Sequence, residues 1–231
     1  NEKRPHILDA NTEKLLTEAQ DALSTPSNVY GMFSNADLEF EDAIDKDGQA
    51  YPLTQGTFIK YLESDDRELR ASAFRNVYKA YGAHNNTLGA TLAGEVKKNV
   101  FNARTHHYRS ARERALSNNH IPEAVYDNLI KTVHKYLPLL HRYTKLRQEL
   151  LGLDDLKMYD LYTPLVKDVK FEMPYEEAKS WMLKALEPMG EEYLNVVKEG
   201  LDNRWVDVYE NKGKRSGGYS SGGHLTNPFI L

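Results

Sequence analysis

The sequence contains no cysteine, which excludes disulfide bonds and thiolate chemistry and fits a reducing compartment. It also lacks a run of about eighteen apolar residues, so neither a membrane-spanning helix nor a secretory leader is predicted. The 30 basic and 34 acidic residues nearly cancel to a formal net charge of -4. Because no strong positive field results, nucleic acid is not an expected partner. We therefore expect a cytoplasmic protein that binds neither membranes nor nucleic acid.

Familiar catalytic and metal-binding motifs are absent as well. None of the eight histidines lies in a His-Glu-x-x-His motif. His106 and His107 are adjacent and would point about 100° apart on a helix, while His134 and His141 would lie two turns apart. Neither pair suits one tetrahedral zinc ion. No Gly-x-Ser-x-Gly nucleophile motif occurs either. The sequence therefore predicts no catalytic residue and no metal ligand in this chain.

Helical periodicity dominates what the sequence does contain. Apolar residues recur at steps of three and four in most stretches, as Phe74, Val77 and Tyr78 illustrate. Capping residues, prolines and glycines then mark the ends of the expected helices. The predicted helices run from Asp9 to residue 24, from Thr54 to 62, from 67 to 108 with a break near Gly82, from Pro122 to Gly152 with a kink at Pro138, from Pro174 to Pro188, and over 193–201.

Only four short runs read as β-structure. Residues 38–44 and 49–53 flank an Asp-Lys-Asp-Gly sequence at 45–48, which is typical of a tight turn and predicts a small hairpin. Alternating apolar residues over 205–209 predict a strand. Residues 227–231 are a further strand-like run. The predicted fold class is therefore mainly α, a multi-helix assembly with a small β-hairpin near the N-terminus and a short β segment at the C-terminal end.

The C-terminal stretch is unusually rich in glycine. Residues 212–223 read KGKRSGGYSSGG and precede the apolar run 227–231. Glycine reaches positive φ and allows a backbone to approach a ligand closely. A phosphate-binding loop is excluded because Arg215 follows Lys214 where Ser or Thr is required, and Val208 stands where another glycine is required. We expect this loop to deliver an edge strand that needs partners beyond its own residues.

Several segments closely resemble oligoendopeptidase F. The similarity extends in order along nearly the whole chain. It is carried by FSNADL (33–38), LESDDR (62–67), NTLGATL (86–92), IPEAVYDNLI (121–130), LPLLHRY (137–143), MYDLY (158–162), KGKRSGGYSSG (212–222) and TNPFIL (226–231).

The resemblance implies a cytoplasmic zinc metalloendopeptidase of the thimet-oligopeptidase-like group, which cleaves oligopeptides within a clam-like, mostly helical lobe structure. In that family zinc is held by the two histidines of His-Glu-x-x-His and a downstream glutamate. Those ligands are expected beyond Leu231, so this chain alone should be inactive. Residues 1–76 would form an N-terminal lobe segment with the hairpin. Residues 77–231 would begin the catalytic domain and pack against its remainder.

The same resemblance assigns the glycine-rich segment to the substrate. An edge strand beside the zinc site can pair with an extended oligopeptide through backbone hydrogen bonds. The residues expected to bind substrate are Gly217, Gly218, Tyr219, Ser220, Asn227 and Phe229. Two alternatives remain open at this point. The segment is an ordinary glycine hairpin that supports the zinc-binding helix, or the whole chain is a self-sufficient helical protein-interaction module without catalysis.

Overall fold

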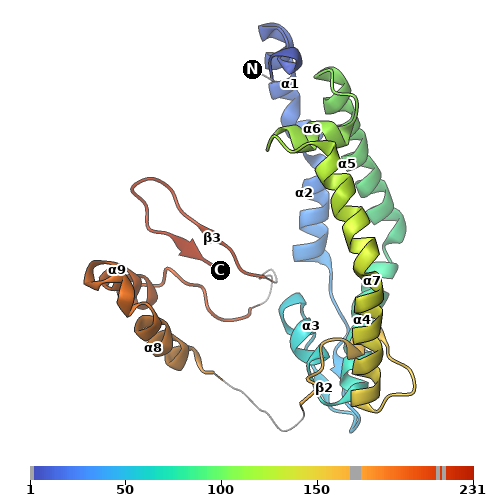
Figure 1. Ribbon diagram of the computed structural model, residues 1–231, viewed down its shortest axis with the longest axis vertical. Helices are drawn as coiled ribbons and strands as arrows, with labels where there is room; N and C mark the ends of the chain where they lie inside the picture. Colours follow the sequence, from blue (N-terminus) through green and yellow to red (C-terminus); the bar gives the residue numbers. More distant parts are fainter. Residues whose placement is uncertain (1–2, 167–172, 212–213, 215–216) are drawn as a thin grey trace. The chain divides into compact units, whose positions relative to one another are not determined.

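The computed structural model describes residues 3–166, 173–211, 214 and 217–231. The chain is mainly helical and carries two small antiparallel sheets, as predicted (Figure 1). Its described residues divide into two compact units. Unit 1 takes those of Asn1–Phe40 and Arg75–Leu161, and unit 2 takes those of Glu41–Phe74 and Tyr162–Leu231. Within the described residues, no helix is both long enough and apolar enough to cross a membrane.

The first helices of unit 1 follow directly on one another. Helix α1 (Ala10–Leu23) begins at Asp9, whose carboxylate accepts hydrogen bonds from two backbone amides of the first turn, each 3.1 Å long. It ends where predicted, but the chain does not leave the helical conformation. Helix α2 (Thr25–Met32) starts at once with Pro26 in its first turn, where proline's missing N–H is not needed. The π-helical turn η2 (Phe33–Asp37) continues it. Neither α2 nor η2 was predicted from the sequence.

The long helical region after Arg67 is broken as predicted. Helix α4 (Arg67–Gly82) ends at Gly82, and α5 (Asn85–Thr105) follows within unit 1. Helix α2 packs against α5. Gly94 makes this approach possible, because a Cβ atom there would lie only 3.0 Å from Cγ of Pro26.

Two more helices complete unit 1. Helix α6 (Ala111–Ser117) was not predicted. Helix α7 (Glu123–Leu151) follows Pro122 and ends at Gly152, whose left-handed φ of 65° confirms the predicted stop. The interior proline expected to kink this helix, Pro138, lies inside it.

A buried polar contact holds the chain that follows α7. Arg147 is 6% exposed, and its Nη2 donates a 3.2 Å hydrogen bond to the carbonyl oxygen of Asp160 in η3 (Met158–Asp160). Asp160 is fully buried, and its carboxylate accepts a 3.0 Å bond from the amide of Lys157. These bonds satisfy polar groups that would be costly to bury unpaired.

The hairpin expected near the N-terminus opens unit 2. Strands β1 (Ala43–Ile44) and β2 (Ala50–Tyr51) pair antiparallel, with Gly48 at a φ of 84° in the turn between them. The strands are shorter than the runs 38–44 and 49–53 predicted. Helix α3 (Gln55–Leu62) follows, capped by Thr54 as predicted. The core beneath them consists of small and aliphatic side chains, Ala43, Leu53, Leu62, Leu69, Ala71 and Ala73.

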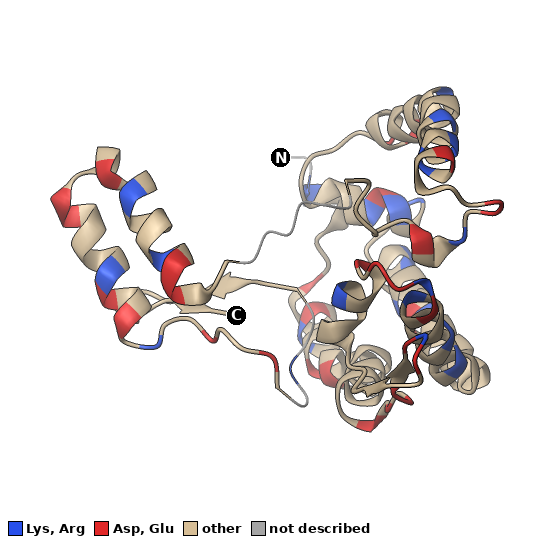
Figure 2. Cartoon of the chain, turned by 90° about the horizontal axis from the view of Figure 1, so that it is seen from below, with Lys and Arg blue, Asp and Glu red and all other residues tan. Residues whose placement is uncertain are grey.

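Two helices form the second part of unit 2. Helix α8 (Tyr175–Ala185) starts after Pro174, and α9 (Glu191–Asp202) starts after Gly190, with the short η4 (Glu187–Met189) between them. The two helices contact each other, and Lys179 of α8 pairs with Asp202 of α9 at 2.9 Å. Both have two glutamates in their first turn, where acidic side chains favour a helix N-terminus. Acidic and basic residues are interspersed along the helices of both units (Figure 2).

Candidate functional site

The glycine-rich stretch folds into a hairpin with the C-terminal run. Strand β3 (Ser220–Ser221) pairs antiparallel with β4 (Phe229–Ile230), Ser220 opposite Ile230 and Ser221 opposite Phe229. Tyr219 and Leu231 extend the ladder by exchanging two backbone hydrogen bonds, each 2.9 Å long. The backbone of residues 229–231 is thus hydrogen-bonded to the chain that precedes it.

The turn of this hairpin is held by a side chain. The Thr226 hydroxyl accepts a 2.9 Å bond from the amide of Gly223 and donates a 3.0 Å bond to its carbonyl oxygen. Leu225 at the tip has a φ of 63° and is 92% exposed. Positive φ is uncommon for a residue other than glycine.

The strand predicted over 205–209 is wrong in extent. The structure has a single parallel bridge, between Val206 and Ile230. The amide of Ile230 donates to the carbonyl of Trp205 at 2.7 Å, and the amide of Asp207 donates to the carbonyl of Ile230 at 2.8 Å. Pairing stops there because the carbonyls of Asp207 and Tyr209 both accept 2.8 Å bonds from the Lys214 ammonium instead.

These bonds correct the expectation that the C-terminal run is an edge strand without partners. One side of β4 bonds to β3 and the other side bonds to the segment around Val206. Strand β4 therefore lies in the middle, and β3 is the outer strand of the three. Because the amide and carbonyl of Tyr219 face Leu231, those of Ser220 face the opposite, outer side. Among the described residues, no strand pairs with that outer side of β3.

The residues expected to bind substrate fall on this hairpin. Gly217 has a φ of 97°, a conformation that favours glycine. A Cβ atom on Gly218 would lie 3.0 Å from the carbonyl oxygen of Leu231. The rings of Tyr219 and Phe229 lie on one face with centroids 6.2 Å apart.

Asn227 and Ser220 complete the predicted set and are both exposed. The structure thus brings the set together on one hairpin. Of the predicted basic loop, Lys212, Gly213, Arg215 and Ser216 lie outside the described residues, whereas Lys214 has its ammonium bound to the chain itself.

Sequence reasoning missed the residues that support the hairpin. Lys214 is 10% exposed and also pairs with the Asp207 carboxylate at 3.3 Å. Trp205 packs its indole on Gly200 of α9, where an added Cβ would meet Cε3 at 2.7 Å. A glycine five residues before a tryptophan, at the end of a predicted helix, was the available signal for this contact.

A zinc ion, which the resemblance implies, finds no ligand set here. Across residues 3–166, 173–211, 214 and 217–231, no group of three or more His, Asp or Glu side chains is arranged to hold a metal ion. The residues of the hairpin supply backbone amides and carbonyls rather than such ligands. What this site can do chemically is pair an extended backbone and present two aromatic rings beside it.

Comparison with protein families gives two matches. Residues 60–230 match the family described as Peptidase family M3, and residues 1–40 match the one described as Oligopeptidase F. The first match covers the whole hairpin apart from Leu231, along with α8 and α9.

Individual relatives agree with these matches. The chain is 57% identical over 99% of its length to oligopeptidase PepF of Bacillus subtilis, of which it covers 34%. It is 46% identical to the group B oligopeptidase PepB of Streptococcus agalactiae, covering 38% of that protein. The crystal structure of oligoendopeptidase-F from Enterococcus faecium superimposes with a TM-score of 0.70 at 42% identity, over 87% of this chain and 38% of that one. The chain thus spans about a third of the length of the curated relatives it matches.

Proposed function

Because this chain belongs to peptidase family M3, we propose that it is part of a zinc-dependent endopeptidase that hydrolyses oligopeptides. Relatives named as oligopeptidases that it matches over 99% of its length support this proposal. We place the enzyme in the cytoplasm, which suits a chain without cysteine. We also assign residues 1–76 to an N-terminal lobe segment and residues 77–231 to the start of the catalytic domain.

The role proposed for this chain rests on one observation: among the described residues, no strand pairs with the outer side of β3. An extended peptide can add to such a side as one more strand, through bonds to the amide and carbonyl of Ser220. Because these bonds involve only backbone atoms, they accept many peptide sequences. Tyr219 and Phe229 form an aromatic pair on one face of the hairpin, where they can contact alternate side chains of the peptide. Gly217 and Gly218 permit close approach, and Asn227 lies at the entry to β4.

A proline substitution in the longer enzyme tests this role. Ser220→Pro removes the outward amide of β3 and leaves the Tyr219–Leu231 bonds intact, because proline is tolerated on the outer side of a strand. We expect kcat/KM for oligopeptides to fall about tenfold, the loss of one hydrogen bond in the bound peptide. Ser220→Ala is the matched control and should retain activity, since it keeps the amide. Equal activity of the two variants would refute pairing along β3.

In this proposal, the residues of this chain do not bind the catalytic metal. We propose that zinc ligands lie beyond Leu231 and that zinc supplies Lewis-acid activation of water in the complete site. The chain of 231 residues should then contain no stoichiometric zinc and hydrolyse no peptide. Metal analysis and a fluorogenic peptide assay on this chain check both points, and zinc at one equivalent with activity would overturn the assignment.

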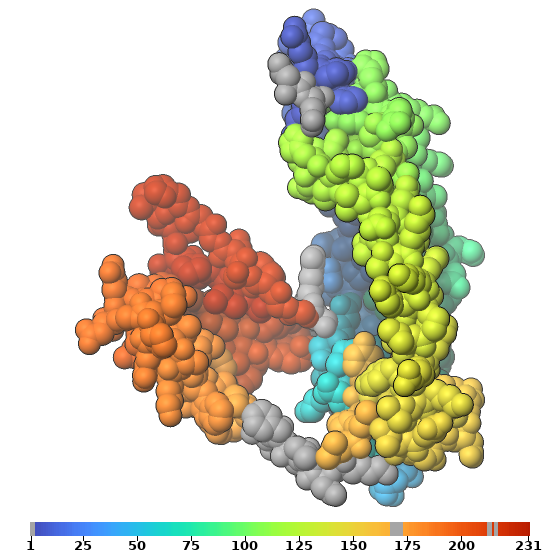
Figure 3. Space-filling model, viewed as in Figure 1, coloured from blue at the N-terminus to red at the C-terminus, as the bar shows by residue number. Residues whose placement is uncertain are grey.

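The remainder of the catalytic domain is the partner we propose for the exposed apolar side of α7. Five residues on one stripe of this helix are between 50 and 60% exposed, namely Val125, Leu129, Val133, Tyr136 and Leu140. The space-filling view shows the visible face of α7 open along its length (Figure 3). An apolar stripe of this size normally packs against another element.

A further inference from the structure

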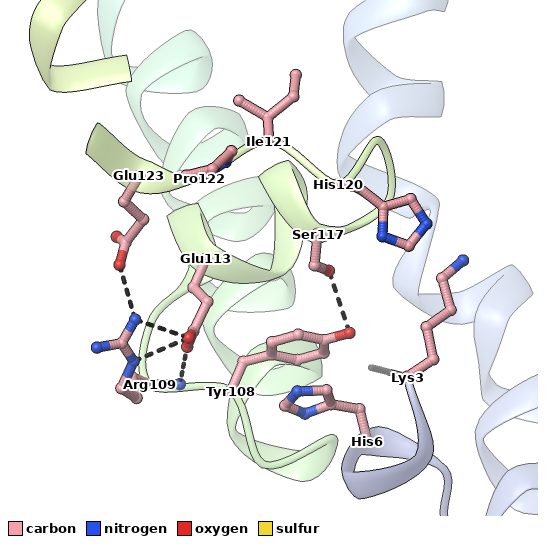
Figure 4. A pocket seen from close by; sticks show the side chains of 10 residues that line it. All are labelled: Lys3, His6, Tyr108, Arg109, Glu113, Ser117, His120, Ile121, Pro122 and Glu123. Carbon is pink, nitrogen blue, oxygen red and sulfur yellow. Dashed lines mark hydrogen bonds and ion pairs between the residues drawn. The ribbon is translucent and has the colours of Figure 1, made fainter. Parts of the chain in front are cut away.

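Unit 1 contains a pocket far from the peptidase hairpin in sequence. It has a volume of about 400 Å³ and lies where η1 (Arg4–His6) meets the connections on either side of α6 (Figure 4). His6 and Tyr108 stack with ring centroids 3.6 Å apart and planes 7° apart, which joins η1 to the chain after α5. Ile121 and Pro122 add apolar surface. The pocket is therefore built from three separate segments and has the size of a small-molecule site.

Side chains able to donate to an anion gather on one side of this pocket. Figure 4 shows the Lys3 side chain extending toward the His120 imidazole, with the His6 ring near the backbone end of Lys3. The Lys3 ammonium has no ion pair or hydrogen bond with any described residue. Nδ1 of His6 lies 2.8 Å from the carbonyl oxygen of His106, so this nitrogen carries the proton of that bond. Because Nδ1 carries that proton, Nε2 of His6 donates to an anion only when the imidazole is protonated.

The two acidic residues of the pocket do not neutralise the positive charge of Lys3. The Glu113 carboxylate accepts 2.6 and 2.8 Å bonds from the backbone amide and Nε of Arg109. The bond from that amide is the main reason why the pKa of Glu113 lies below its ordinary value. Glu123 accepts a 3.0 Å bond from Arg109 and a 2.7 Å bond from Arg112. Both carboxylates are thus paired with arginine, whereas Lys3 has no counter-ion among the described residues.

The conformation of His120 is a second and independent observation. Its φ is 54°, and the bonds from His120 to Ser117 and from Ile121 to Leu116, each 3.1 Å, close α6 as a Schellman motif. Glycine is the usual residue at this position, because other side chains are strained there. A residue held in a sparsely populated backbone conformation beside a pocket motivates a hypothesis of function. Here the His120 imidazole lies beside the end of the Lys3 side chain (Figure 4).

We propose that this pocket binds a small organic anion, a carboxylate or a phosphate monoester, whose charged group lies between Lys3, His6 and His120. The apolar part of the ligand contacts Ile121 and Pro122. The hydroxyls of Ser117 and Tyr108, which are 3.1 Å apart, are further hydrogen-bonding groups of the pocket. This site is independent of the peptidase assignment, because it involves no residue of the hairpin.

Titration of the 231-residue chain with two probes tests the proposal. Glycerol 3-phosphate represents the phosphate monoesters and succinate the carboxylates, with binding measured by calorimetry and by NMR of the histidine side chains. We expect saturable binding of at least one probe, with shifts at His6 and His120. Saturation by one probe alone identifies that class, and saturation by both assigns recognition to the negative charge they share. Absence of saturable binding with both probes overturns the proposal.

Substitutions locate the site without depending on a folding defect. His120→Gly should weaken binding about tenfold, the loss of one hydrogen bond to a charged group, while thermal stability stays equal or rises because glycine suits the positive φ. Lys3→Ala should weaken binding to a similar extent. Lys14→Ala is the matched control, since the Lys14 side chain is 77% exposed on α1 and lies outside the pocket. Unchanged affinity in His120→Gly, or an equal loss in Lys14→Ala, contradicts the proposal.

Discussion

Glycines in this chain have opposite roles at different positions, and their surroundings decide which. Gly200 of α9 lies beneath the indole of Trp205, where a Cβ atom would approach Cε3 to 2.7 Å. Gly89 of α5 has no atom within 4 Å of the corresponding position. Gly200 therefore allows a close contact, whereas Gly89 only lowers the helix propensity of α5.

Alanine at these two positions should change stability in opposite directions. Gly200→Ala forces the Trp205 ring to move and should destabilise unit 2 by about 1 to 2 kcal/mol. Gly89→Ala should stabilise α5 by up to about 1 kcal/mol. Urea unfolding measures both effects. Tryptophan fluorescence reports on unit 2, which contains both Trp181 and Trp205, and circular dichroism reports on the helices of unit 1 as well. A stabilising effect at Gly200 would mean that the indole does not pack there.

The hairpin of unit 2 should respond to acid through Asp45. Its pKa lies below the ordinary 3.8, chiefly because its carboxylate accepts a hydrogen bond from the amide of Gln49, with a further bond from the Tyr51 hydroxyl. A lowered pKa means that the folded state favours the ionised form. The stabilising contribution is therefore complete above the unfolded pKa and is lost as pH falls through the folded value. NMR titration should place the Asp45 midpoint below 3.8, and Asp45→Asn should remove the acid-dependent loss of hairpin signals.

At the scale of elements, local chemistry made most helices predictable. Asp9, Thr54 and Gly152 end or begin helices through bonds or backbone angles that involve only near neighbours in sequence. Helix α2 was missed because Pro26 reads as a helix breaker although it is harmless in a first turn. Helix α6 has only seven residues, too few to show a period.

The residues of the candidate site could be predicted from the sequence, but the pairing of its strands could not. The glycines and aromatic residues of the hairpin are evident in the sequence, so its residues could be named. Which strand lies in the middle depends on the bridge between Val206 and Ile230 and on the bonds of Lys214 to two carbonyls. The bridge joins residues distant in sequence, and the Lys214 bonds, although local, leave no periodic pattern from which they could be predicted.

Lys214 should control how firmly the segment 205–209 is held. Its ammonium bonds to the carbonyls of Asp207 and Tyr209, so Lys214→Ala should free them and loosen the bridge to β4. We expect amide hydrogen exchange at Asp207 and Ile230 to accelerate about tenfold, the equivalent of one hydrogen bond to a charged group. Lys198→Ala on the exposed side of α9 is the control and should leave both amides unchanged. Equal exchange rates in the two variants would rule out this role.

At the scale of the whole molecule, the exposed apolar stripe of α7 should dominate solution behaviour. The isolated chain should bind an apolar fluorescent dye and self-associate, because the stripe is open to water. Leu129→Glu combined with Val133→Lys replaces two stripe residues by an i,i+4 ion pair that favours the helix. Dye binding and association should then fall, as measured by fluorescence and by light scattering. A monodisperse parent chain without dye binding would contradict this expectation.

The position of β4 also sets an order of events during synthesis. The residues that fill the middle of the three-stranded arrangement, Phe229 and Ile230, are made after both of their neighbours. On the ribosome, β3 and the segment around Val206 therefore cannot pair with β4 until these residues emerge from the exit tunnel. Folding of this part cannot proceed from the N-terminus onward, because the strand that joins the other two is the last of the three to be made.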